Sequence, residues 1–185
     1  GTLFFIANDG ATGRELWSYP WVTSYDVNAA TPIVHGDKVF ITSGYNKGCA
    51  LLTITRSLQP QLVWQNSSLR GQVASPVLVG DHLYGIDGQL GGKGQLACVE
   101  LATGNQKWSK PGYGTGTLIA ADGKLIVLGE RGQVAIGPAS PSGFEPTAEA
   151  QLFGGTSWVS PALADGRLYC RNNVGDLVCL DLRRK

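Results

Sequence analysis

The sequence contains no methionine and only two histidines, and each scarcity narrows what the chain can do. His35 and His82 lie beside Gly-Asp pairs, in turns that are usually solvated, so neither is expected to serve as a catalytic base. No CxxC pair is formed by the four cysteines, Cys49, Cys98, Cys170 and Cys179. Their spacing argues against a zinc site. We therefore expect no catalytic constellation and no metal site.

Charge is also scarce, since only 16% of the residues are charged and the net charge is +1. Such a balance does not attract nucleic acid or anionic lipid, so neither is expected as a partner. No run of 18 apolar residues is present, which excludes a helical membrane span, and the first residues lack the basic and apolar segments of an export signal. Because the chain lacks methionine and opens inside a repeat, we expect it to be a piece of a longer protein.

What the sequence does contain is glycine, 26 residues, and a repeat. Two apolar runs joined by a Gly/Asp turn recur four times, and the equivalent residues Val39, Leu83, Leu125 and Leu168 are separated by 44, 42 and 43 residues. A glycine that opens a third apolar run follows each time, and a fourth segment ends near Trp17, Trp64 or Trp108. Four short strands in about 43 residues are typical of a propeller blade.

The repeat predicts an all-β chain, a β-propeller of four-stranded antiparallel blades with about four blades present, as a partial or small propeller. Residues 1–185 form one domain in this interpretation, divided into blades at 1–20 (partial), 30–65, 74–109, 117–153 and 159–182 (partial). The blade at 117–153 has no tryptophan, and Phe144 or Phe153 is expected to fill its place.

Residues Ala7–Trp17 match the pattern AxDxxTGxxxW at every fixed position, and Cys98–Trp108 depart from it only at Cys98 and Glu100. In this motif the chain resembles the pyrroloquinoline quinone (PQQ) repeat propellers, and within them the outer-membrane assembly factors of the BamB type. The resemblance implies that Trp17, Trp64 and Trp108 dock each blade on the next. It also implies a periplasmic or outer-membrane-associated location.

Two functions follow from this resemblance. The first is a non-catalytic binding or scaffolding module for a protein or polysaccharide partner, with no cofactor. The alternative is a fragment of a quinone- and calcium-dependent dehydrogenase, which would need PQQ and calcium. Such dehydrogenases often stack an adjacent pair of cysteines on the quinone, and this sequence has no such pair.

Binding residues are expected on the face that carries the connections between blades. The candidates are Tyr25, Asp26, Asn28, Arg70, Gln72, Tyr113, Trp158 and Asn172, and the facing loops add Tyr45, Asp87, Glu130, Arg131 and Asn173. A competing interpretation is that these polar groups only cap strand ends and hydrogen-bond loop backbone. Partners would engage this face or an exposed strand edge.

Two structural questions stay open at this stage. If residues Arg14–Trp17 supply the missing strand of the last blade, four blades close into a small ring; otherwise an open half-ring exposes strand edges that invite self-association. Cys170 and Cys179 fall on neighbouring strands and could lie close, although two reduced, buried thiols are the favoured state.

Overall fold

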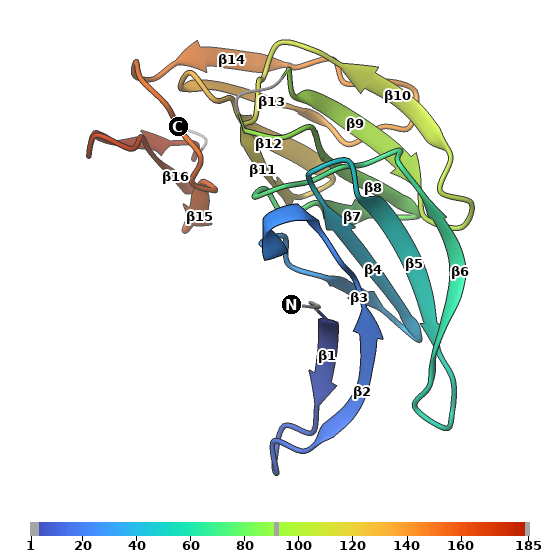
Figure 1. Cartoon of the computed structure of the whole chain (residues 1–185). Coiled ribbons are helices and arrows are strands. Elements are labelled where there is room, and N and C mark those ends of the chain that lie inside the picture. Colours follow the sequence, from blue (N-terminus) through green and yellow to red (C-terminus); the bar gives the residue numbers. More distant parts are fainter. Residues whose placement is uncertain (1–3, 91–92, 184–185) are drawn as a thin grey trace.

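The computed structural model describes residues 4–90 and 93–183, and these fold into five antiparallel sheets arranged along an arc (Figure 1). The first sheet holds β1 (Phe4–Asn8) and β2 (Glu15–Pro20). The second holds β3 (Ile33–His35), β4 (Lys38–Ser43), β5 (Gly48–Ile54) and β6 (Pro60–Asn66). The third holds β7 (Val77–Val79), β8 (His82–Asp87), β9 (Gln95–Glu100) and β10 (Gln106–Lys110).

The fourth sheet holds β11 (Thr117–Ala121), β12 (Lys124–Leu128), β13 (Gln133–Pro138) and β14 (Ala148–Gln151). The fifth holds β15 (Ala162–Ala164), β16 (Arg167–Arg171) and β17 (Leu177–Asp181). A short 3₁₀ helix, η1 (Ser24–Asp26), lies in the connection between the first two sheets. Within each sheet the strands follow one another in chain order. The prediction of an all-β propeller built from four-stranded antiparallel units is confirmed.

Turn chemistry sets the register of the hairpins. In the β11–β12 turn Asp122 and Gly123 have φ values of 49° and 68°, and in the β15–β16 turn Asp165 and Gly166 have 49° and 70°. Two successive residues with positive φ make the tight turn that matches the twist of antiparallel strands, and Asp-Gly is among the pairs that adopt it at least cost. The recurring Asp-Gly signal in the sequence is therefore a consequence of hairpin geometry.

Each internal sheet buries both of its faces against its neighbours. In the third sheet Leu83 and Val99 pack toward the second sheet, whereas Tyr84 and Cys98, one residue along, pack toward the fourth. Because side chains alternate between the two faces of a strand, burial on both faces requires apolar residues at consecutive positions. This explains the uninterrupted apolar runs of the central strands.

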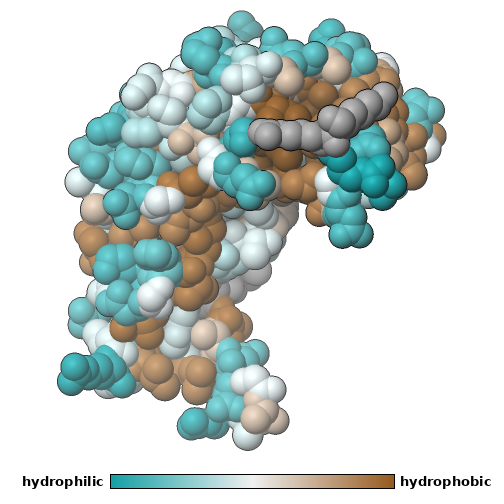
Figure 2. All heavy atoms as spheres, turned by 180° about the vertical axis from the view of Figure 1, so that it is seen from behind, coloured by the Kyte–Doolittle hydropathy of each residue, from teal (hydrophilic) through white to brown (hydrophobic). Residues whose placement is uncertain are grey.

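The arc stays open between the first and the fifth sheet (Figure 1). β2 pairs with β1, with Trp17 opposite Ala7, and the described part of the fifth sheet has three strands. Closure of four blades through residues Arg14–Trp17 is therefore wrong, because among the described residues β2 pairs with β1 and with no strand of the fifth sheet. From behind, hydrophobic residues show along the concave side of the arc (Figure 2).

Cys170 and Cys179 lie on opposite faces of the fifth sheet. Tyr169 pairs with Cys179, and Cys170 pairs with Val178, so the two cysteines are one residue out of step. Both thiols are free; Cys170 is buried, but Cys179 is exposed, which corrects the expectation that both are buried. In a strand of period two, that offset directs one side chain to the core and the other to solvent.

Candidate functional site

The face carrying the connections between sheets, here called the loop face, also bears the β4–β5, β8–β9, β12–β13 and β16–β17 loops. Several predicted residues on it bond inward. The Asn28 amide donates to the Trp21 carbonyl oxygen at 3.2 Å, and its oxygen accepts from the Ser43 hydroxyl at 2.6 Å. Asn172 is buried and donates to the Gly154 carbonyl oxygen at 3.1 Å. These side chains hold loop backbone in place.

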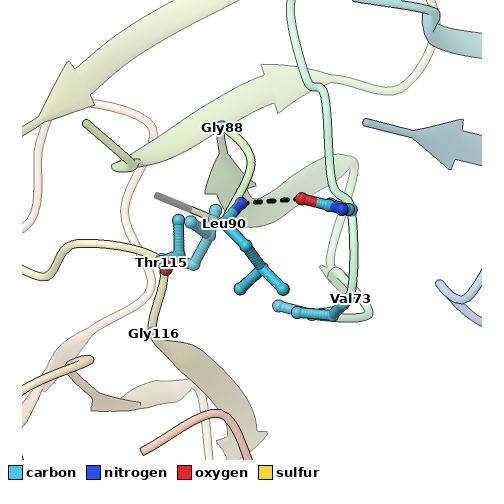
Figure 3. Close-up of a pocket in the computed structure, with 8 residues that line it drawn as sticks. Val73, Gly88, Leu90, Thr115 and Gly116 are labelled. Carbon is cyan, nitrogen blue, oxygen red and sulfur yellow. Dashed lines mark hydrogen bonds between the residues drawn. The ribbon is translucent and has the colours of Figure 1, made fainter. Parts of the chain in front are cut away.

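Gln72, in the connection before β7, also bonds to loop backbone. Its side-chain oxygen accepts a hydrogen bond from the Leu90 backbone at 2.7 Å, and Leu90 and Val73 lie together beside a small pocket (Figure 3). The pocket has about 10 Å³ of free space. That is about the minimum that one water molecule needs, so the pocket has no room for a larger ligand.

Tyr113 and Trp158 lie farther along the arc. Tyr113 is buried and meets the Phe144 ring edge-on, with ring centroids 6.0 Å apart. Trp158 is 42% exposed, and its indole N–H donates to Glu130 at 3.2 Å. Burial raises the pKa of Glu130, but hydrogen bonds from Thr115 and Trp158 outweigh it and leave that pKa below its ordinary value.

Tyr25 and Tyr45 come together from two different segments. Tyr25 belongs to η1 and Tyr45 to the β4–β5 loop, and their ring centroids are 5.3 Å apart at an interplanar angle of 59°. Tyr25 is 84% exposed although it is aromatic. An exposed aromatic pair is a frequent component of recognition surfaces, because it offers a large contact area with little side-chain entropy to lose.

The backbone beneath this pair is strained. Tyr25, Asp26, Tyr45 and Asn46 have φ values of 62°, 53°, 52° and 58°, and they are four of the seven non-glycine residues with positive φ in the described chain. A left-handed conformation costs a residue such as tyrosine about 1 kcal/mol, and costs asparagine or aspartate less. Such strain concentrates at functional sites, so this position is the leading candidate for one.

A groove of about 200 Å³ opens beside the tyrosine pair. The residues that line it, here called the loop-face groove, are Gly44, Tyr45, Asn46, Arg70, Gly88, Gln89 and Lys93. They come from the β4–β5 loop, the connection before β7 and the β8–β9 loop, so its walls belong to two sheets. A Cβ on Gly44 would lie 2.7 Å from the Cβ of Gln72, so glycine is needed here for close packing.

Arg70 is fixed in this groove by Asp87. Its Nε donates to one carboxylate oxygen at 2.9 Å and its Nη2 to the other at 2.7 Å, and its backbone N–H adds a third bond at 2.8 Å. Hydrogen bonding to Asp87 raises the pKa of Arg70. The bidentate pair holds the guanidinium in one orientation.

The structure thus gathers the predicted residues Tyr25, Tyr45 and Arg70 at one place, with Asp26 exposed next to Tyr25. Asn46, Gln89 and Lys93 were missed by sequence reasoning. Asn46 directly follows the predicted Tyr45, and Gln89 comes two residues after the predicted Asp87, but nothing in the sequence shows that their loops face each other.

The tryptophans of the motif lie between sheets. The Trp64 indole N–H donates to the Leu101 carbonyl oxygen of the third sheet at 3.0 Å, and Trp108 donates to the Ser140 carbonyl oxygen at 2.9 Å. Trp17 packs against the buried cluster of the second sheet. Phe153, two residues after β14 of the fourth sheet, packs toward the cluster that contains Leu168 of the fifth sheet, the side on which an indole would lie.

Two further findings concern the described ranges only. No three His, Cys, Asp or Glu side chains gather within them as a metal-binding group would. No helix found there has the length and apolar character needed to cross a membrane.

Comparison with known proteins agrees with the geometry. The family model for the outer membrane protein assembly factor BamB matches residues 4–137. No curated protein sequence matches at a significant level. The crystal structure of BamB from Moraxella catarrhalis superposes with a TM-score of 0.70 at 15% identity, covering 96% of this chain and 55% of that one. At this identity the likeness shows the fold alone.

Two computationally designed proteins are also similar in fold. Ika8 gives a TM-score of 0.64 at 13% identity, over 96% of this chain and 54% of its own. Ika4 gives 0.59 at 11% identity, over 86% of this chain and 94% of its own. The chain therefore spans about half the length of BamB and of Ika8. By the extent of the family match, this chain belongs to the family of the outer membrane protein assembly factor BamB.

Proposed function

We propose that this chain is a non-catalytic binding and scaffolding module, and that a partner protein docks on its loop face at the tyrosine pair and the adjoining groove. The observation that carries the proposal is the contact between Tyr25 and Tyr45, an exposed aromatic pair on strained backbone. Aromatic residues and arginine are enriched among the residues that dominate binding energy, and Arg70 lies in the same groove.

The family supports a protein as the partner, because its description names the assembly of outer membrane proteins. A polysaccharide is the second partner that the same face would accept, since sugar rings stack on exposed tyrosines. The family description also supports a location outside the cytoplasm, in the periplasm or at the outer membrane.

We further propose that the tryptophans have a docking role. Trp64 bonds to the third sheet through its N–H, and its ring faces Gly104, where a Cβ would lie 2.7 Å from a ring carbon. This arrangement fixes the distance between the second and third sheets at the outer side of the arc. The positions of the loop-face loops depend on that distance.

The test is capture of partners from bacterial envelope extracts by the immobilised chain, read by mass spectrometry. Tyr25→Ala combined with Tyr45→Ala removes the aromatic pair and is expected to abolish capture of a defined protein. Tyr169→Ala is the matched control, because Tyr169 is also exposed but lies on the fifth sheet. Equal capture by wild type and the double variant would contradict the proposal, and recovery of glycans in place of protein would favour the polysaccharide.

The dehydrogenase alternative has its own test. The chain lacks adjacent cysteines, and its buried thiols Cys49, Cys98 and Cys170 lie in three different sheets. Residues present in this chain therefore do not supply that part of a quinone site. A change in the quinone absorption spectrum when PQQ and calcium are added together would revive the alternative.

A further inference from the structure

We infer that the loop-face groove receives a carboxylate, presented by an acidic peptide segment of the partner protein. The inference rests on the proposed function, because it assigns a chemistry to the same site. The juxtaposition that carries it is a groove whose charged lining residues are both cations, next to an exposed aromatic pair.

The charges around the groove are unevenly placed. Two positively charged side chains, Arg70 and Lys93, line the groove, and Lys93 is exposed. Asp87, the carboxylate paired with Arg70, does not line the groove; its side chain is 14% exposed, against 39% for Arg70. An approaching anion therefore meets the guanidinium before it meets the carboxylate behind it.

Arg70 retains donors for such an anion. Asp87 takes the Nε–H and one N–H of Nη2, and a guanidinium has five N–H groups in a rigid fork. Three donors thus remain, and the ion pair prevents the side chain from swinging away. A preorganised arginine loses less entropy on binding than a free one.

The neutral residues add to this donor character. The Gln89 side-chain oxygen accepts a hydrogen bond from the Tyr45 backbone at 3.1 Å, which directs the remaining polar group of that amide, the NH₂, away from Tyr45. The groove consequently offers two cations and an amide donor. Charge-assisted bonds from such donors to a carboxylate are stronger than bonds between neutral groups.

The size of the groove favours a peptide side chain over a whole small molecule. At about 200 Å³ it is smaller than the range of roughly 300–1,000 Å³ that is typical of small-molecule pockets. Tyr25 and Tyr45 extend the surface beyond the groove and offer apolar contact to residues flanking the acid. A short segment in which glutamate or aspartate neighbours an aromatic residue fits both parts.

The experiment is an NMR titration of the ¹⁵N-labelled chain with the peptide acetyl-Gly-Glu-Phe-Glu-Gly-amide. Its partner probe, acetyl-Gly-Gln-Phe-Gln-Gly-amide, has the same shape without charge. We expect the acidic peptide to shift the amide signals of Tyr45, Asn46 and Gln89 and to bind at least about fivefold more tightly than the neutral one. Raising salt from about 50 mM to about 300 mM should weaken only the acidic peptide.

Variants locate the effect. Lys93→Gln removes an exposed charge and should weaken the acidic peptide about threefold, whereas Lys107→Gln, an exposed lysine on β10, should leave binding unchanged. Arg70→Gln should weaken binding further, but it leaves the Asp87 carboxylate without its partner. The folding of Arg70→Gln is therefore checked by circular dichroism. If Arg70→Gln is unfolded, the result for Lys93→Gln decides.

Three outcomes would overturn the inference: equal binding of the two peptides, no effect of Lys93→Gln, or tighter binding of an oligoglucuronate than of the acidic peptide. If partner capture still depends on Tyr25 and Tyr45 while the peptides do not differ, only the carboxylate assignment fails. If capture is also independent of the tyrosines, the proposed function fails with it.

Discussion

Alanine at Gly104 should destabilise the chain far more than alanine at the equivalent Gly13. Both glycines follow the threonine of the docking motif, and their φ values are nearly the same, +73° and +71°. A Cβ on Gly104 would lie 2.5 Å from the Asn66 amide nitrogen and 2.7 and 2.8 Å from ring atoms of Trp64, but a Cβ on Gly13 would meet nothing within 4 Å. The two substitutions therefore share the backbone cost and differ in the contacts with Asn66 and Trp64.

The magnitudes follow from these contacts. Left-handed φ costs alanine about 1 kcal/mol relative to glycine at either position. Forcing an extra carbon against a packed ring costs roughly 1–3 kcal/mol more, since Trp64 cannot retreat without losing its bond to the Leu101 carbonyl oxygen. We expect a loss of about 2–4 kcal/mol for Gly104→Ala and about 1 kcal/mol for Gly13→Ala.

Urea unfolding followed by far-ultraviolet circular dichroism measures both losses, and hydrogen exchange of the β2 amides shows whether the first sheet unfolds with the others. Combining Gly104→Ala with Trp64→Ala should reduce the cost of the glycine change but not remove it, because the ring is gone while the Asn66 amide nitrogen still lies 2.5 Å from the added Cβ. If the two alanine variants lose equal stability, or if removing Trp64 leaves the cost at Gly104 unchanged, the proposed docking contact is refuted.

Other predictions concern thiols, acid stability, packing and strain. In the native chain only Cys179 should react with Ellman's reagent at neutral pH, and all four thiols should react in urea, because burial raises the pKa of Cys49 to about 12 and that of Cys98 and Cys170 to about 11. Because its pKa is lower in the folded chain than in the unfolded one, Glu130 should contribute stability at pH 7 that is lost as the pH falls through its lowered pKa; Glu130→Gln should flatten the dependence of the urea midpoint on pH. Phe153→Ala should cost about 2–3 kcal/mol in urea unfolding and speed hydrogen exchange in β16, and an unchanged β16 would contradict its place between the last two sheets. Asn46→Gly should raise stability by at most a few tenths of a kcal/mol, because asparagine tolerates positive φ better than most residues and glycine adds entropy to the unfolded chain; a gain of about 1 kcal/mol or more in urea unfolding would contradict this.

The repeat was predictable because it arises from local chemistry. Hairpin turns need residues that tolerate positive φ, and sheets buried on two faces need uninterrupted apolar strands; both requirements appear directly as Gly/Asp pairs and runs such as Leu125–Leu128. The open arc was not predictable in the same way. The segments that became β1 and β17 have similar third-strand patterns, so residue type alone did not show which of them would pair with β2.

The candidate site was predicted only in part, for a related reason. Tyr25 and Asn172 are both polar loop residues in the sequence, yet one is exposed and the other is buried with its amide bonded to backbone. That difference depends on how each loop folds back, which is not encoded in residue type. Lys93 was missed because its distance from Arg70 in the chain gives no indication that the two meet across a groove.

The groove has one wall on the second sheet and one on the third, while the indole of Trp64 is bound to the third sheet from the second. The two features are mechanically linked, because any tilt between these sheets changes the width of the opening. Substitutions at Trp64 or Gly104, which do not line the groove, would then alter affinity by widening or narrowing the loop-face groove. Evolution could tune recognition in this chain through the contact between Trp64 and the third sheet, without changing a single residue that touches the partner.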